Sequence, residues 1–149
     1  MKVRTFVAGS ARLLLALGLV SSSALAADRP SAPSGDWPHR DHDAGGSRFS
    51  PLTQIDARNV ASLQQAWAYD TGSPNIQVTP IVVGGQMYIG TGRTIAALEP
   101  ETGKEIWKFT APGTVSRRGV AYWPGDAKTP PRIFAGAGDK LMALDAKSG

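Results

Sequence analysis

A stretch of 17 residues recurs in this sequence without a gap, 46 positions after its first appearance, so that residues 87–103 align with residues 133–149. Gly90, Gly92, Ala97, Leu98 and Gly103 recur as Gly136, Gly138, Ala143, Leu144 and Gly149. A period in the forties is typical of repeat architectures, in which one small unit cannot bury both of its faces without neighbours. The repeat therefore constrains the fold more than any other feature of the chain.

The first copy has the pattern of four short antiparallel strands. An apolar, β-branched run at 78–83 precedes the turn signal Gly84-Gly85, and a second strand is expected at 87–90. Residues 94–98 and 106–109 predict two more strands on either side of a polar turn. Four strands within about 32 residues form a propeller blade or a piece of a sandwich, and the repeat favours the propeller.

A third, partial copy of the repeat unit lies earlier in the chain. Trp67-Ala68-Tyr69 resembles Trp107-Lys108-Phe109, the last strand of the unit, but no other strands of a unit precede it. We interpret it as an orphan fourth strand that completes the final blade and removes the exposed sheet edges. Propellers need typically 4 to 8 blades. The chain offers about one to two, so we expect it to be incomplete after Gly149.

The segments before the repeat predict export. Residues 1–26 contain basic residues, an apolar run too short to span a membrane, and the cleavage pattern Ala24-Leu25-Ala26, which together indicate a signal peptide. Residues 27–36 are rich in Pro, Ser and Gly and are expected to form a flexible leader. Asp56 is a plausible N-cap for a short helix over 57–64. The expected product is exported and periplasmic, with no transmembrane segment after cleavage.

Composition excludes several kinds of site. The sequence has no cysteine, so disulfides, thiolate metal sites and a lipid-modified N-terminal cysteine are not available. Three of the 16 basic residues lie in the signal, which leaves 13 against 12 acidic residues and no basic patch for nucleic acid. His39 and His42 lack a third spaced ligand, which argues against a metal site there.

Residues 97–107, with the sequence ALEPETGKEIW, closely resemble the tryptophan-docking repeat of the pyrroloquinoline quinone (PQQ) dehydrogenases, whose pattern is A-x-D-x-x-T-G-x-x-x-W. The resemblance implies that the tryptophan packs on a glycine-containing segment of the next blade and that the acidic residue ties the turn. Glu99 stands where the pattern has aspartate, whereas Asp145 restores it in the second copy.

Two further segments carry the same resemblance. Residues 45–52, GGSRFSPL, resemble the family's N-terminal G-G-x-R-Y-S-P-L segment, and residues 118–123, RGVAYW, resemble a segment of its glucose-dehydrogenase-like members. The similarity covers nearly all of 37–149, which we interpret as the N-terminal part of the propeller domain. It implies an all-β, eight-bladed propeller and an enzyme that oxidises sugar, polyol or alcohol hydroxyls.

Two positions are candidate cofactor-binding residues by this resemblance. Arg118 matches the arginine that binds a carboxylate of PQQ, and a guanidinium suits this role because it presents a planar, bidentate donor fork. A surface arginine in a loop beside Arg117 is the plainer interpretation. Gln77 falls where many members have a glutamate that touches the cofactor, although it could equally be a polar residue at a strand entry.

The resemblance also implies what this chain does not contain. The Ca²⁺ that polarises PQQ, the ligands of that ion and the catalytic aspartate are expected in later blades, so the chain alone is expected to be inactive. Electrons would pass to a quinone or to cytochrome c. The lack of paired cysteines favours the sugar or polyol branch. A non-enzymatic scaffold propeller of the same repeat and a degenerate gene remnant remain as alternatives.

Overall fold

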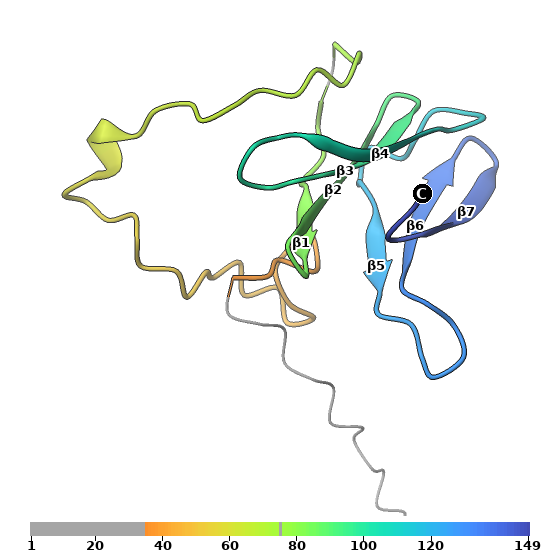
Figure 1. Cartoon of the computed structure of the whole chain (residues 1–149), viewed down its shortest axis with the longest axis horizontal. Coiled ribbons are helices and arrows are strands. Elements are labelled where there is room, and N and C mark those ends of the chain that lie inside the picture. Colours follow the sequence, from red (N-terminus) through yellow and green to blue (C-terminus); the bar gives the residue numbers. More distant parts are fainter. Residues whose placement is uncertain (1–34, 75) are drawn as a thin grey trace, which may run out of the picture. The chain divides into compact units, whose positions relative to one another are not determined.

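The computed structural model describes residues 35–74 and 76–149, and these form an all-β arrangement of two antiparallel sheets (Figure 1). The expected signal peptide, and the expected leader up to residue 34, lie outside the described residues. Within the described part, no helix has the length and apolar character needed to cross a membrane.

The first sheet has the four strands that the sequence predicts, in sequential order. They are β1 (Ile81–Val83), β2 (Gln86–Thr91), β3 (Thr94–Leu98) and β4 (Glu105–Thr110). Gly84 and Gly85 connect the first two strands with φ angles of 58° and 76°, the combination that a tight two-residue hairpin turn requires. The strand expected from residue 78 begins only at Ile81, because Pro80 has no N–H to donate to a ladder.

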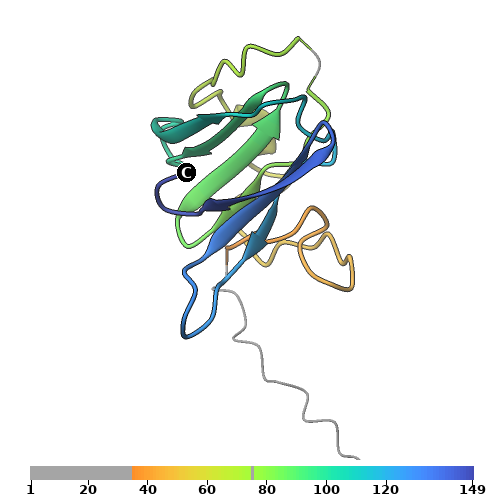
Figure 2. The same cartoon turned by 90° about the vertical axis from the view of Figure 1, so that its right-hand side faces the viewer.

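The second sheet repeats the first with one strand fewer among the described residues. Its strands are β5 (Ala121–Trp123), β6 (Arg132–Ala137) and β7 (Lys140–Asp145), again in sequential order (Figure 2). Tyr88 pairs with Ala97 in the first sheet, and Phe134 pairs with Ala143 in the second. These pairs are 46 positions apart in sequence, so the repeat does form equivalent strands of two sheets, as predicted.

The period differs in the first strand of each sheet. Ile81 lies opposite Tyr88, and Ala121, only 40 positions after Ile81, lies opposite Phe134. The difference arises because the two-residue turn of the first sheet is replaced by the loop 124–131 in the second. Asp126 orders this loop, since its carboxylate accepts the N–H groups of Lys128 and Thr129. The extra length stays at the hairpin tip and leaves the ladder unchanged.

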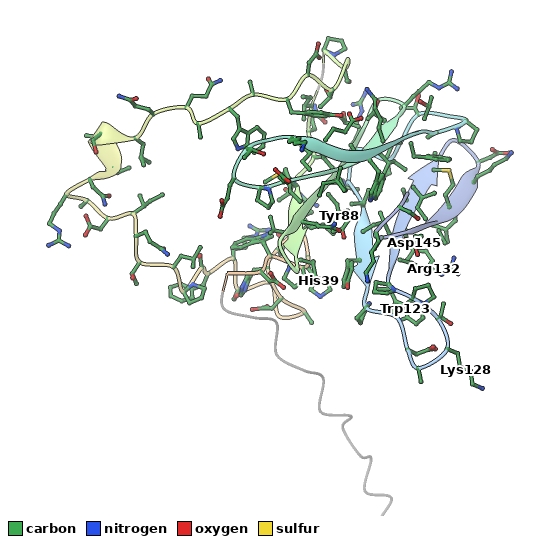
Figure 3. All side chains as sticks on the ribbon, viewed as in Figure 1. His39, Tyr88, Trp123, Lys128, Arg132 and Asp145 are labelled. Carbon is green, nitrogen blue, oxygen red and sulfur yellow. The ribbon has the colours of Figure 1, made fainter. Side chains whose placement is uncertain are left out.

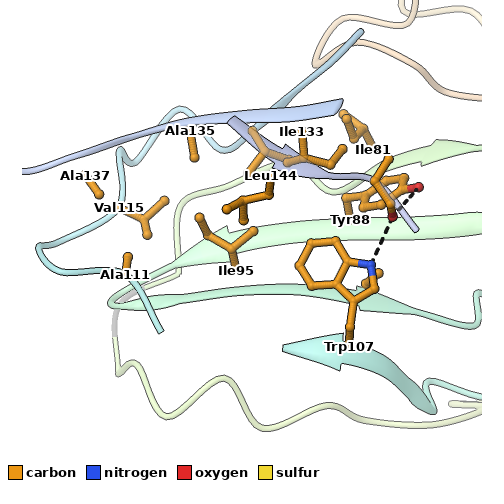
Figure 4. Close-up of a cluster of buried hydrophobic side chains, with 13 residues drawn as sticks. Ile81, Tyr88, Ile95, Trp107, Ala111, Val115, Ile133, Ala135, Ala137 and Leu144 are labelled. Atoms are coloured by element: carbon orange, nitrogen blue, oxygen red, sulfur yellow. Dashed lines mark hydrogen bonds between the residues drawn. The ribbon is translucent and has the colours of Figure 1, made fainter. Parts of the chain in front are cut away.

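Trp107, on the outer strand of the first sheet, docks against the end of the second (Figure 4). Its indole N–H donates to the carbonyl of Ala146 at 2.9 Å. A Cβ at Gly149 would lie 2.6 Å from the indole Cε3, so only glycine lets the ring approach the backbone this closely. The tryptophan packing implied by the family resemblance is therefore present.

Trp67 makes the same contact one sheet earlier. Its indole N–H donates to the carbonyl of Pro100 at 3.0 Å, and its ring covers Gly103, where a Cβ would lie 2.4 Å from Cε3. Pro100 and Gly103 stand 46 positions before Ala146 and Gly149, so the two docking sites are equivalent. Residues 67–69 form no strand and pair with neither of the two described sheets. Trp67 thus docks as Trp107 does, and the pairing of 67–69 with a final blade stays a prediction.

The predicted helix over 57–64 is wrong. Only Val60–Ser62 is helical, as a single 3₁₀ turn, and Asp56 instead closes the turn before it by accepting the N–H of Arg58. Val60 and Leu63 are 51% and 57% exposed, so the apolar face that was to stabilise the helix has no core to pack against.

The core lies between the two sheets and draws side chains from both (Figure 4). From the first sheet, Ile95 and Ala97 are fully buried. From the second sheet, Ile133 and Ala135 are at most 2% exposed. Small side chains alternate with branched ones, which allows two twisted sheets to approach closely.

The segment between the sheets joins them through its backbone. Val115 N–H donates to the carbonyl of Gly92 in the first sheet at 2.7 Å, and Ser116 N–H donates to that of Gly136 in the second at 2.8 Å. Gly90 makes room for this segment, since a Cβ there would lie 2.7 Å from Val120. The connection between the two sheets is thus fixed to both of them.

The second copy ties its turn more tightly than the first. The Asp145 carboxylate, across the ladder from Arg132 (Figure 3), accepts the N–H groups of Lys147 and Ser148 and the Ser148 hydroxyl, which lower its pKa below the ordinary value. Glu99 accepts only the hydroxyl of Thr102, at 2.8 Å. The longer glutamate side chain displaces its carboxylate from the backbone N–H groups of its own turn.

Replacing Gly103 by alanine is expected to destabilise the docking of Trp67. Gly103 and Gly85 have similar φ angles of 70° and 76°, but a Cβ at Gly85 would have no neighbour within 4 Å. Gly85→Ala should therefore cost about 1 kcal/mol from the backbone alone, and Gly103→Ala about 1–3 kcal/mol more. Urea unfolding of both variants measures the difference, and equal losses would contradict the docking role.

The turn of the first copy is expected to be improved by Glu99→Asp. The shorter carboxylate can accept backbone N–H groups as Asp145 does, which should add a few tenths to about 1 kcal/mol of stability. Thermal unfolding measures the gain. Asp145→Glu is the matched reverse change and should lower the unfolding temperature; if both changes acted in the same direction, the proposed geometry of the turn would be wrong.

Stability is expected to fall at alkaline pH, in part because of Tyr88. Burial raises the pKa of Tyr88 to about 12, and its hydroxyl donates to Gln86 Oε1 at 2.6 Å. Because this pKa exceeds the value of about 10 in an unfolded chain, the contribution is complete below pH 10 and is lost as the pH rises towards 12.

Urea unfolding between pH 9 and 12 should show this decline, and it should be shallower in Tyr88→Phe. Part of the slope should persist in the variant, because the pKa values of Tyr69 and Tyr122 are also raised by burial. Identical slopes for the two proteins would show that Tyr88 does not contribute.

Candidate cofactor-binding site

The segments that enter the first strands of the two sheets lie against each other. Residues 76–80 lead into β1, and residues 116–120 lead into β5. Gly119 has a φ of 83°, and a Cβ there would lie 3.5 Å from the Thr79 carbonyl oxygen. Two segments about 40 positions apart in sequence are thereby brought into contact, and each carries one of the candidate cofactor-binding residues.

Arg118 lies in a tight turn. The Gly119 N–H donates to the Ser116 carbonyl at 3.0 Å, and the Arg118 N–H donates to the Ser116 hydroxyl at 3.2 Å. The Arg118 side chain is exposed and forms no ion pair with any residue in the described part of the chain. Its guanidinium is therefore available to an anion.

Gln77 lies on the other segment and is also exposed. It lines a cavity of about 180 Å³, together with residues from the β2–β3 turn and from the connection between the sheets. The lining residues are Ser73, Pro74, Gln77, Val78, Thr91, Gly92, Thr114, Val115 and Arg117. The arginine that shares this cavity with Gln77 is thus Arg117, while Arg118 is not among its lining residues.

In the sequence, Arg117 stands out only as the neighbour of Arg118. The pair of adjacent arginines was a visible signal, but a sequence does not show which of two successive side chains in a turn faces a cavity. Gln77 and Arg118 do lie on contacting segments. Their roles towards a cofactor stay predictions.

A larger and more open groove of about 660 Å³ adjoins the cavity. The two share Ser73, Pro74, Gly92 and Thr114. Arg93 and Lys108 supply positive charge to the groove and Asp70 supplies negative charge. Hydroxyl and charged groups dominate its wall, so it suits hydrated, polar ligands better than apolar ones.

The described residues contain no cluster of three or more His, Cys, Asp or Glu side chains that could hold a metal ion. The loop with His39 and His42 is closed on itself instead. Asp43 accepts hydrogen bonds from the hydroxyl and the backbone N–H of Ser47, which lower its pKa to about 2. The imidazole of His42 lies beside the Trp37 ring, with centroids 4.8 Å apart.

Two consecutive sheets in the same register, each receiving an indole on a glycine at its last turn, define a repeat β-propeller of the tryptophan-docking kind. Residues 37–149 match the PQQ family described as glucose/ethanol/alcohol dehydrogenase, beta-propeller domain, and the chain belongs to this family.

Individual relatives agree with this assignment. The chain is 37% identical over 128 residues to the dehydrogenase subunit of the quinone alcohol dehydrogenase of Gluconobacter oxydans, covering 77% of this chain and 16% of that protein. It is 36% identical over 141 residues to the quinoprotein glucose dehydrogenase of Escherichia coli, covering 76% of this chain and 18% of that protein.

Solved structures show the same similarity. The crystal structure of the quinohemoprotein alcohol dehydrogenase from Comamonas testosteroni superposes with a TM-score of 0.65 at 36% identity, covering 76% of this chain and 18% of that chain. The chain thus spans between about a sixth and about a quarter of the length of the curated relatives it matches. Those relatives are oxidoreductases that use alcohols or glucose, according to their names.

Proposed function

We propose that this chain supplies part of the PQQ-binding wall of a periplasmic dehydrogenase that oxidises hydroxyl groups of sugars, polyols or alcohols. The observation that supports this most is the contact between the two strand-entry segments at Gly119 and Thr79. It brings the segments of Gln77 and Arg118 together at the start of two consecutive sheets, in a chain that belongs to the PQQ propeller family.

The residues present fit such a cofactor. PQQ is a flat quinone with three carboxylates, and when bound it takes up the electrons and protons removed from a hydroxyl substrate. Arg118 can hold one carboxylate with two parallel N–H donors, and its exposed guanidinium has no competing ion pair among the described residues. Gln77 can both donate and accept a hydrogen bond at the edge of the same wall.

The rest of the activity is proposed to lie in further sheets. In the first sheet Ile95 and Ala97 are fully buried, whereas Leu141 and Ala143, their counterparts 46 positions later, are exposed, Leu141 by 77%. A sheet packed on that face would bury them in the same way. We place the Ca²⁺ ligands and the catalytic aspartate in such sheets.

The electron acceptor is proposed to be a quinone or a cytochrome c. Both kinds of acceptor occur in the names of relatives, such as the quinone alcohol dehydrogenase of Gluconobacter oxydans and the 1-butanol dehydrogenase (cytochrome c) of Thauera butanivorans. Export through the N-terminal signal would place the protein in the periplasm.

Titration of the purified ¹⁵N-labelled chain with PQQ, with and without CaCl₂, tests the proposal. Saturable NMR shifts are expected at the amides of Gln77, Arg118 and Gly119. Arg118→Gln should weaken binding about tenfold or more, because a charge-assisted hydrogen-bond pair is lost.

Arg58→Gln is the matched control, since it removes an exposed arginine that pairs with Asp56 at 2.6 Å. It should leave PQQ binding unchanged. If the wild-type chain showed no saturable shifts, or if both variants bound PQQ equally weakly, the proposed cofactor site would be wrong.

A further inference from the structure

The 180 Å³ cavity between the two strand-entry segments contains positive charge without a counter-charge. Arg117 is its only charged lining residue among the described ones, and no aspartate or glutamate reaches its wall. Neutral polar residues line the cavity beside Arg117, namely Thr91, Thr114 and Gln77, whose side chains can donate hydrogen bonds. A concave surface with one cation and several neutral hydrogen-bond donors is selective for an anion.

The wall that carries Arg117 is held in place by the backbone. Just before Arg117, the Val115 N–H donates to the Gly92 carbonyl at 2.7 Å, and the Ser116 N–H donates to the Gly136 carbonyl at 2.8 Å. The carbonyl of Thr114 accepts the N–H of Gly138 at 3.0 Å. Because both sheets fix the base of this turn, little backbone entropy remains to be lost when an anion binds.

The size of the cavity limits what can enter it. A volume of about 180 Å³ lies below the roughly 300–1,000 Å³ of pockets that enclose whole drug-sized ligands. A carboxylate group fits such a space, but a fused three-ring quinone does not. The ring system would therefore stay outside, with one acidic substituent directed inward.

We propose that Arg117 is an anion-binding residue of this cavity and that it holds one carboxylate of PQQ, while Arg118 outside the cavity holds another. This inference rests on the proposed function. A ligand with several carboxylates can neutralise both guanidiniums at once. With one carboxylate held by each arginine, the quinone ring system cannot rotate within its own plane.

The test follows the side-chain Nε–H signals of Arg117 and Arg118 in the ¹⁵N-labelled 149-residue chain. The probes are PQQ and, separately, oxalate, which has carboxylates but no ring. We expect both probes to shift the Arg117 signal, and Arg117→Gln to weaken PQQ binding about tenfold. Arg117→Lys should bind PQQ with intermediate affinity, because it keeps the charge but loses the planar fork. Thermal unfolding of each variant, unchanged from wild type, shows that the fold is intact.

The outcomes separate this inference from the proposed function. If Arg117→Gln binds PQQ like wild type while Arg118→Gln does not, Arg117 has no role and the proposed cofactor site stands. If oxalate shifts Arg117 but PQQ binds nowhere on the chain, the cavity takes another acid, and both proposals fail. If neither probe shifts either arginine, the cavity is not an anion site and both proposals fail as well.

Discussion

The packing of an indole on a glycine backbone is the interaction on which the arrangement of the two sheets depends. A four-stranded sheet has two faces and can cover neither by itself. Trp107 closes the gap between the outer edge of one sheet and the last turn of the next, and its N–H satisfies the Ala146 carbonyl there. Gly149 must lack a side chain for this contact to form. The spacing of tryptophan and glycine in the sequence thus indicates which residues of neighbouring sheets contact each other.

The sequence could predict the strands of this fold because their pattern is repeated. The constant offset of 46 residues fixes which positions pair, and the observed registers of Tyr88 and Phe134 follow it. The helix predicted over 57–64 is absent, and the local sequence pattern alone could not show this. An amphipathic stretch forms a stable helix only when something covers its apolar face, and Val60 and Leu63 remain exposed here. Residues 67–69 pair with no described sheet, so their predicted place in a final blade stays a prediction.

The candidate site was predictable only in outline. Family resemblance pointed to Arg118 and Gln77, and the structure shows that their segments touch, because Gly119 allows the close approach to Thr79. Arg117 was missed, since the direction of a side chain in a tight turn depends on φ and ψ angles that the sequence does not specify. The cavity itself is formed by three segments that are separate in sequence, so no local pattern could reveal it.

The hairpin loop 124–131 has a consequence for how such chains can diverge. It replaces a two-residue turn, yet β5 and β6 pair in the same register as their counterparts. It lies at the tip between these strands, whereas the turns that line the cavity lie at the other end of the sheets. Insertions can therefore accumulate at one end of the sheets without disturbing the cavity at the other end. The length of the loop at that end can change at little cost in folding free energy, so new surfaces can evolve there.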